Sequence, residues 1–179
     1  MWVYIRPGIM QDEAVILLVE DRGDDILLIQ KAFTKAEVPN PMMVVRDGEE
    51  AIAYLAGEGK FANRAEYPLP WLVLLDLKMP RVDGFEVLRW IRKQPGFSST
   101  IVIVLTSSQE IRDVNRAYQL GANSFMVKPL EFENAVSVSK MIQQYWLMHN
   151  RFPETKRAGQ ESSEVRHKDR ASTDRTKIQ

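Results

Sequence analysis

Five polar residues stand at the ends of apolar, strand-like runs, and their side chains suit phosphoryl chemistry. Glu20 and Asp21 follow the first run, Asp76 the third, Thr106 the fourth and Lys128 the fifth. In a parallel sheet these strand ends meet in one crevice, where open α/β folds place their chemistry. Three carboxylates packed together repel one another unless a cation lies between them, and hard oxygen ligands suit Mg²⁺. The sequence therefore predicts a magnesium site at this rim.

The predicted Mg²⁺ ion would assist the transfer of a phosphoryl group. Asp21 and Asp76 can each supply one oxygen, Glu20 can act through a bound water, and the loop after Asp76 can add a backbone carbonyl. The open positions would then accept a phosphoryl oxygen and offset charge as phosphorus is attacked. A free Asp76 oxygen is the obvious nucleophile, and Thr106 and Lys128 can hold the other phosphoryl oxygens. Asp76 is accordingly predicted to be a phosphoacceptor.

The elements that must position these residues alternate along the chain. Apolar runs at 14–20, 42–46, 71–76, 100–107 and 124–129 alternate with amphipathic stretches at 26–33, 47–59, 82–96, 110–122 and 131–148. Five βα units of this length predict an α/β fold, a doubly wound, parallel five-stranded sheet with helices on both faces. We expect the flavodoxin-like strand order 2-1-3-4-5.

Local signals support several of these helices. Asp47 is placed to cap the second helix, and Gly57 or Gly59 to end it. Phe85, Leu88 and Ile91 form an apolar stripe on the third.

The last helix carries a second apolar stripe, which predicts its buried side. Ala135, Val138, Ile142 and Tyr145 recur at helical spacing and are expected in the core. Trp146 and Met148 lie beside or beyond the stripe and are expected to be exposed. An exposed aromatic there would indicate a surface for a partner or for self-association.

Composition limits the possible classes of protein. The 179 residues are 45% hydrophobic and contain no Cys, which fits one domain held by packing and excludes thiolate chemistry. We expect one folded domain at 12–148, an N-terminal extension at 1–11 and a polar, disordered tail at 149–179. No apolar run is long enough for a membrane span, so a cytoplasmic protein is expected. Lys plus Arg equals Asp plus Glu at 24 each, so nucleic acid is a poor candidate partner.

The motifs ILLVEDRGDD, LLDLKMPRVDGFEVLRWIR, VIVLTSS and GANSFMVKPLEF together resemble the receiver domain of two-component response regulators. The resemblance covers about residues 12–148 and implies that a sensor histidine kinase is the phosphoryl donor. It makes Asp76 the phosphorylated residue, with Mg²⁺ as cofactor. By position it implies further roles: Glu20 and Asp21 as the acidic pair, Lys78 as the backbone-carbonyl metal ligand, Thr106 as the switch hydroxyl, Phe125 as the switch aromatic, and Lys128 as the lysine before a cis proline.

Two shorter stretches narrow the resemblance. VEDRGDD and YWLMHN are typical of stand-alone receivers associated with bacteriophytochromes, which implies a bacteriophytochrome as a candidate kinase. The predicted function is a single-domain response regulator that switches a protein contact, with homodimerisation through the face formed by 110–122, 124–129 and 131–148. A phosphorelay shuttle or an unphosphorylated scaffold are the alternatives.

Two other classes of protein and several single-residue explanations fit the sequence less well. A phosphohydrolase that forms an aspartyl-phosphate usually has a second Asp two residues after its nucleophile, whereas this chain has Lys78, so no enzyme beyond its own phosphotransfer and dephosphorylation is expected. A flavin-binding fold lacks its phosphate loop here. Taken singly, Asp21 or Asp24 could cap the first helix, Thr106 could be an ordinary strand residue and Lys128 a surface charge. We also expect Lys78 and Ser107 to affect the phosphoryl lifetime.

Overall fold

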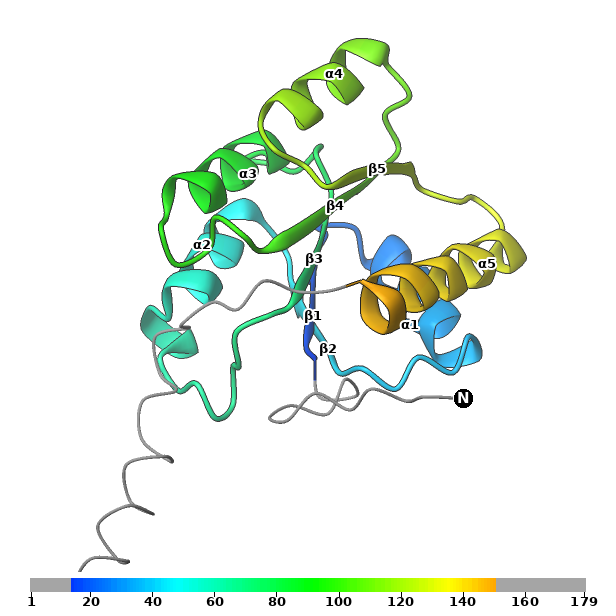
Figure 1. Ribbon diagram of the computed structural model, residues 1–179, viewed down its shortest axis with the longest axis horizontal. Coiled ribbons are helices and arrows are strands. Elements are labelled where there is room, and N and C mark those ends of the chain that lie inside the picture. Colours follow the sequence, from blue (N-terminus) through cyan, green and yellow to red (C-terminus); the bar gives the residue numbers. More distant parts are fainter. Residues whose placement is uncertain (1–13, 151–179) are drawn as a thin grey trace, which may run out of the picture.

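A five-stranded parallel sheet lies at the centre of the molecule, with helices on both faces (Figure 1). The computed structural model describes residues 14–150. The strand order is β2-β1-β3-β4-β5, so the predicted fold class and order are confirmed. The extension at 1–11 and all but the first two residues of the tail at 149–179 lie outside the described residues.

The elements follow the predicted alternation. The strands are β1 (Ile16–Val19), β2 (Met42–Val45), β3 (Leu72–Leu75), β4 (Ile101–Thr106) and β5 (Ser124–Val127). The helices are α1 (Gly23–Lys35), α2 (Gly48–Ala56), α3 (Gly84–Lys93), α4 (Ile111–Gln119) and α5 (Phe132–Ile142). A short 3₁₀ turn, η2 (Gly59–Phe61), follows α2, and a π-helix, η3 (Gln143–His149), continues α5.

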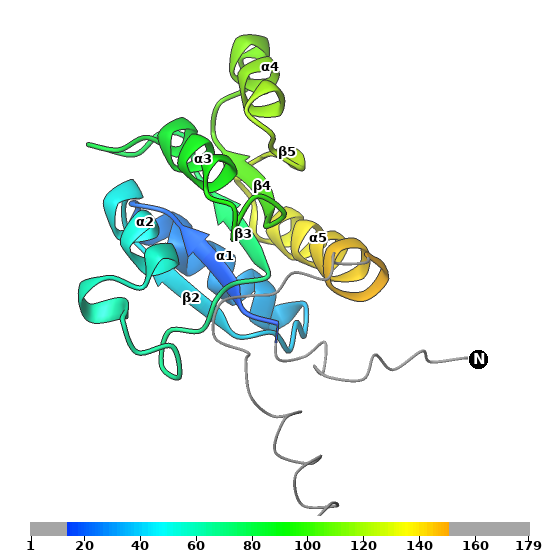
Figure 2. The same cartoon turned by 60° about the vertical axis from the view of Figure 1, so that its left-hand side comes forward.

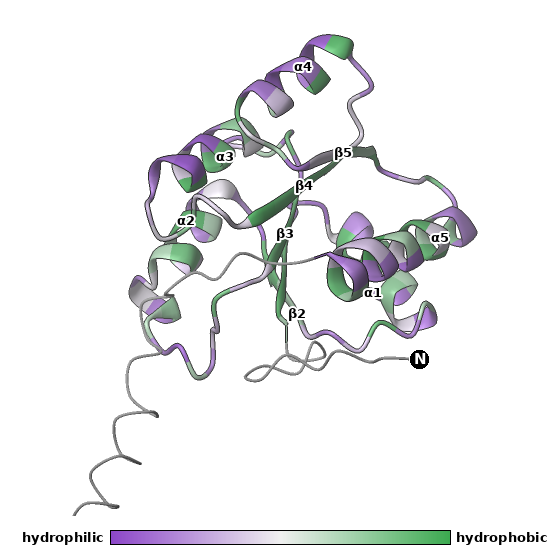
Figure 3. Cartoon of the chain, viewed as in Figure 1, coloured by the Kyte–Doolittle hydropathy of each residue, from purple (hydrophilic) through white to green (hydrophobic). Residues whose placement is uncertain are grey.

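Alternate residues of the central strands supply two separate cores. In β3, Val73 and Leu75 pack with α2 and α3, whereas Leu72 and Leu74 pack with α1 and α5. β1 and β4 alternate in the same way. Apart from Thr106 at the end of β4, these three strands are apolar (Figure 3), because a parallel sheet covered on both faces has no side for polar residues.

Capping residues fix the helices that border the site. The Asp47 side chain accepts a hydrogen bond from the backbone N–H of Glu50, and Gly57 ends α2 in the left-handed conformation, as predicted. α3 begins with a capping box in which Asp83 and Glu86 each accept a backbone N–H from the other. The N-cap of α1 is Arg22, with no side-chain capping bond. Capping therefore does not explain Asp21 or Asp24.

The end of the last helix differs from the prediction. Tyr145 was expected in the core but is 59% exposed, and Trp146 was expected at the surface but is half-buried against the core beside α1 and α5. Leu147 is buried instead, and Met148 is exposed as expected. The reason is the change from α to π geometry after Ile142, because a π turn contains more residues than an α turn and shifts the inward position along the chain.

Candidate functional site

Backbone hydrogen bonds between neighbouring strands hold the rim residues in place. The N–H of Asp76 donates to Val19 O at 3.0 Å, and that of Glu20 donates to Val45 O at 3.1 Å. The N–H of Lys128 donates to Thr106 O at 2.8 Å. Each rim residue therefore extends the ladder of its strand by one step, which brings side chains from four strand ends to one edge of the sheet.

Lys128 is the centre of the charged cluster. Its Nζ lies 2.5 Å from Glu20 Oε2, 2.7 Å from Asp76 Oδ2 and 3.0 Å from Asp25 Oδ2. The Lys128 side chain is 8% exposed, and those of Glu20 and Asp76 are 1% and 3% exposed. Lys128 is thus a buried cation shared by three carboxylates and not a surface charge.

The electrostatics reflect this burial. Burial raises the pKa of Glu20, and the charge of Asp76 adds to the increase, while Lys128 acts in the opposite direction. Burial alone would lower the pKa of Lys128, but its hydrogen bonds with Asp76 and Glu20 outweigh that effect, so its pKa is raised. Lys128 therefore stays charged at neutral pH.

The carboxylates of Glu20, Asp21 and Asp76 fit a divalent cation. One oxygen from each lies within 4.8 Å of the others. Among the described residues, Asp21 Oδ1 is buried without a hydrogen-bond partner. A buried carboxylate oxygen without a partner is costly, and a hard cation would satisfy it. The donor set is therefore suited to Mg²⁺.

The loop after Asp76 is folded tightly against that residue. Asp76 Oδ1 accepts the backbone N–H of Lys78 at 3.2 Å. Gly84, at the start of α3, leaves no room for a side chain, since a Cβ there would collide with the Asp76 carbonyl oxygen and lie 2.8 Å from Leu77 Cα. The start of α3 therefore determines where the Asp76 loop runs.

Thr106, Phe125 and Lys78 are the remaining residues that the sequence predicted for the site. Thr106 is fully buried, and its Oγ1 accepts the backbone N–H of Ser108 at 3.4 Å. Phe125 is half-buried against the core beside α2 and α3. The Lys78 side chain is 54% exposed and points towards the start of α4. The resemblance implied a cis bond before Pro129, but the described residues contain no cis peptide bond, so that expectation is wrong.

Asp25 is a member of the cluster that sequence reasoning missed. It lies in the first turn of α1, three residues from Arg22, whose guanidinium is 3.8 Å away. Its neighbour Asp24 is exposed. The two adjacent acids were visible in the sequence, but which of them faces the site depends on the rotation of α1 about its axis.

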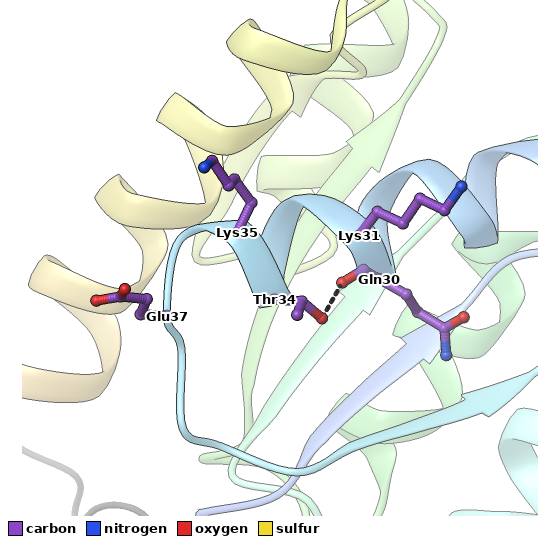
Figure 4. A pocket seen from close by; sticks show the side chains of 5 residues that line it. All are labelled: Gln30, Lys31, Thr34, Lys35 and Glu37. Atoms are coloured by element: carbon purple, nitrogen blue, oxygen red, sulfur yellow. Dashed lines mark hydrogen bonds between the residues drawn. The ribbon is translucent and has the colours of Figure 1, made fainter.

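A shallow hollow lies elsewhere, at the C-terminal end of α1. Its lining residues are Gln30, Lys31, Thr34, Lys35 and Glu37 (Figure 4). α1 begins at the rim and runs away from it, so this hollow is remote from the carboxylates. The carboxylate cluster, and not the hollow, is the candidate site.

Comparison with known proteins identifies the class to which this fold and site belong. The response regulator receiver domain family matches residues 16–140, and the chain belongs to that family. Receiver domains of this family are phosphorylated on an aspartate and bind Mg²⁺ at an acidic pocket. They are generally signalling domains and not enzymes.

Several known proteins are similar to this one over most of its length. The probable methanogenesis regulatory protein FilR2 of Methanothrix harundinacea is 39% identical over 80% of this chain and 90% of its own length. Response regulator Rcp1 of Synechocystis is 35% identical over 77% and 95%. The phosphorylated cyanobacterial phytochrome response regulator RcpA is similar in structure, with a TM-score of 0.73 and 38% identity over 79% of this chain and 99% of that one. The Mn²⁺-bound form of Rcp1 gives a TM-score of 0.71 and 34% identity, with coverage of 79% and 99%.

No helix among residues 14–150 is long and apolar enough to cross a membrane.

Proposed function

We propose that this protein is a single-domain response regulator that accepts a phosphoryl group on Asp76 in a Mg²⁺-dependent reaction. The observation that carries the proposal is the position of the Asp76 carboxylate, which is buried at a strand end between Lys128 and the acidic pair Glu20 and Asp21. A buried carboxylate with an ammonium on one side and a cation-binding group on the other is suited to attack on phosphorus.

In this proposal Glu20, Asp21, Asp76 and the backbone carbonyl of Lys78 hold the ion. Bound Mg²⁺ would neutralise charge on the phosphoryl oxygens and align them with the attacking carboxylate. The support from this chain is the unpartnered Asp21 Oδ1 beside the other two carboxylates.

In the proposed transfer, one Asp76 oxygen attacks the phosphorus of a phosphohistidine. An O–P bond forms while the N–P bond breaks, and the electron pair of the broken bond returns to the imidazole. Lys128 Nζ, now 2.7 Å from Asp76 Oδ2, can follow the new negative charge onto a phosphoryl oxygen. Thr106 accepts the Ser108 N–H, which leaves its own hydroxyl proton for another phosphoryl oxygen. In this proposal the Phe125 side chain, as the switch aromatic, moves when Thr106 moves.

The test is the intact mass of the protein incubated with Mg²⁺ and acetyl phosphate. We expect one added phosphoryl group, which is lost in Asp76→Asn and with a chelator but kept in the exposed-acid control Asp24→Asn. If acetyl phosphate gives no adduct, the same comparison is made with a histidine kinase as donor. No adduct from either donor would refute the proposal and favour an unphosphorylated scaffold.

Membership of the family points to a sensor histidine kinase as the donor. The similarity to phytochrome response regulators makes a bacteriophytochrome the kinase to test first. Transfer that is faster in one light state of such a kinase than in the other would support this assignment. Equal transfer from unrelated kinases would argue against it.

We further propose that output is a protein contact, through homodimerisation on the face formed by α4, β5 and α5. Exposed apolar side chains gather on these elements and their connections: Ile111, Tyr118, Val127, Leu130 and Phe132. Leu130 is 95% exposed, which is unusual for a side chain without a partner surface. Light scattering before and after phosphorylation tests this contact, with Leu130→Glu expected to weaken it and the exposed Leu27→Glu on α1 as control. A mass that stays monomeric in both states would instead favour a phosphorelay shuttle.

A further inference from the structure

A path of polar contacts outside the carboxylate cluster connects the Asp76 loop to the start of α4. Lys78 Nζ lies 3.7 Å from Asp113 Oδ2, in the first turn of α4, and 4.0 Å from Glu110 Oε1. Asp113 Oδ2 also accepts the Ser108 hydroxyl at 2.6 Å, and Ser108 N–H donates to Thr106. The path therefore begins beside Asp76, passes through α4 and returns to Thr106.

The Asp113 carboxylate is better placed for an ion pair than most surface acids. Its side chain is only 13% exposed, and the buried Ser108 fixes its orientation. Glu110 is exposed and also pairs with Arg112, so it is the weaker partner of Lys78. An ammonium that meets a fixed, largely desolvated carboxylate gains more than it would in an exposed pair.

The rest of α4 is held at its C-terminal end. Ala117 is its one buried residue, and Arg116 stacks over the Phe85 ring at 4.0 Å. Beyond the helix, Arg92 donates to Gly121 O at 2.7 and 2.9 Å. Figure 2 shows α4 standing outward from the sheet. Its N-terminal end has no side-chain capping bond from Glu110, and Asp113 connects that end to Lys78 and to Ser108.

We propose that Lys78 is a positioning residue that holds the start of α4 through Asp113 while Asp76 is unphosphorylated, and that a phosphoryl group on Asp76 draws the Lys78 ammonium away and releases it. This inference rests on the proposed function. The backbone N–H of Lys78 already lies 3.2 Å from Asp76 Oδ1, so its side chain starts next to the group that would carry the new charge. A phosphoryl group with about two negative charges competes favourably with a single carboxylate.

Hydrogen exchange of the amides at 110–119, measured by mass spectrometry, tests the proposal. Lys78→Met removes the ammonium and keeps the aliphatic stem. In the unphosphorylated protein we expect α4 to exchange roughly two- to five-fold faster in this variant, the range that an ion pair of this kind supports. Asp113→Asn, which can still accept the Ser108 hydroxyl, should do the same, and the double variant should add little. Lys93→Met, at an exposed lysine of α3 that forms no ion pair within residues 14–150, is the control.

The same measurement after phosphorylation tests the release. Wild-type exchange at 110–119 should rise to the level of Lys78→Met, and Lys78→Met should rise little further. Unchanged or slower α4 exchange in unphosphorylated Lys78→Met would show that Lys78 does not hold α4, whether or not Asp76 is phosphorylated. A phosphoryl adduct that leaves wild-type α4 exchange unchanged would overturn the release. Failure to form any adduct would instead refute the proposed function, while the unphosphorylated comparison would still decide whether Lys78 holds α4.

Discussion

At the scale of single residues, the Lys128 ammonium is shared by three carboxylates that compete for it. Lys128 contacts Glu20, Asp76 and Asp25, and only the first two follow from the motif of the family. Asp25 competes for Lys128 and places another negative charge near the position that a phosphoryl group would take. It is therefore expected to weaken the hold of Lys128 on that group.

Asp25→Asn should lengthen the life of the phosphoryl group on Asp76. Removing this charge lowers the repulsion and frees Lys128 for the phosphoryl oxygens, with an effect of roughly two- to ten-fold. Decay of the phosphorylated mass after removal of the donor measures it. Asp24→Asn is the matched control, because this neighbouring side chain is exposed. A lifetime that is unchanged or shorter in Asp25→Asn would show that Asp25 does not compete for Lys128.

Gly84 has no room for a side chain, because a Cβ there would clash with the backbone of Asp76 and Leu77. Gly84→Ala would press a methyl group against the backbone of Asp76 and Leu77, which is expected to cost roughly 1–3 kcal/mol of unfolding free energy and to slow phosphorylation. Gly96→Ala is the control, since a Cβ at Gly96 would meet nothing within 4 Å. Urea unfolding of the two variants compares them. Equal stabilities would mean that the loop after Asp76 yields easily.

At the scale of elements, the change from α5 to η3 decides which side chains are buried. Leu147→Ala is expected to lower the free energy of unfolding by about 2–4 kcal/mol, because it empties a buried site. Tyr145→Ala should change it by about 0.5 kcal/mol or less, since that side chain is exposed. Chemical denaturation distinguishes the two. The opposite order would indicate that the α-helical stripe continues to Tyr145.

Features that follow from strand order or from local signals could be predicted from the sequence, whereas features that depend on packing between helices could not. Glu20, Asp76 and Lys128 were placed correctly because parallel strands deliver their carboxyl ends to one edge, which follows from strand order alone. The caps of α2 depend on local signals and were also predicted. Asp25 and Leu147 were not, because the rotation of a helix and the number of residues in its last turns are decided by packing between elements, which no local pattern records.

At the scale of the whole molecule, the acidic site couples metal binding to folding. The carboxylates of Glu20, Asp21 and Asp76 are held together in the folded protein, so their mutual repulsion is a cost of folding that a bound cation removes. Mg²⁺ at ten times its dissociation constant should add about 1.4 kcal/mol to the free energy of unfolding.

Thermal unfolding with and without Mg²⁺ measures this coupling. Addition of a chelator should abolish the increase in melting temperature. Asp21→Asn should also abolish it, and should make the metal-free protein more stable because one negative charge is gone. Asp24→Asn should keep the increase. A shift of equal size in Asp21→Asn would place the ion at another site.

The alternation of side chains along β1, β3 and β4 has a consequence for how this protein can change over time. The sheet is a partition, with one compartment filled by α1 and α5 and the other by α2, α3 and the buried residue of α4. Substitutions that reshape one compartment leave the packing of the other intact. The helices of the two compartments can therefore diversify separately, and exchanging the helices of one compartment with those of a relative should yield folded hybrids that keep the Asp76 rim.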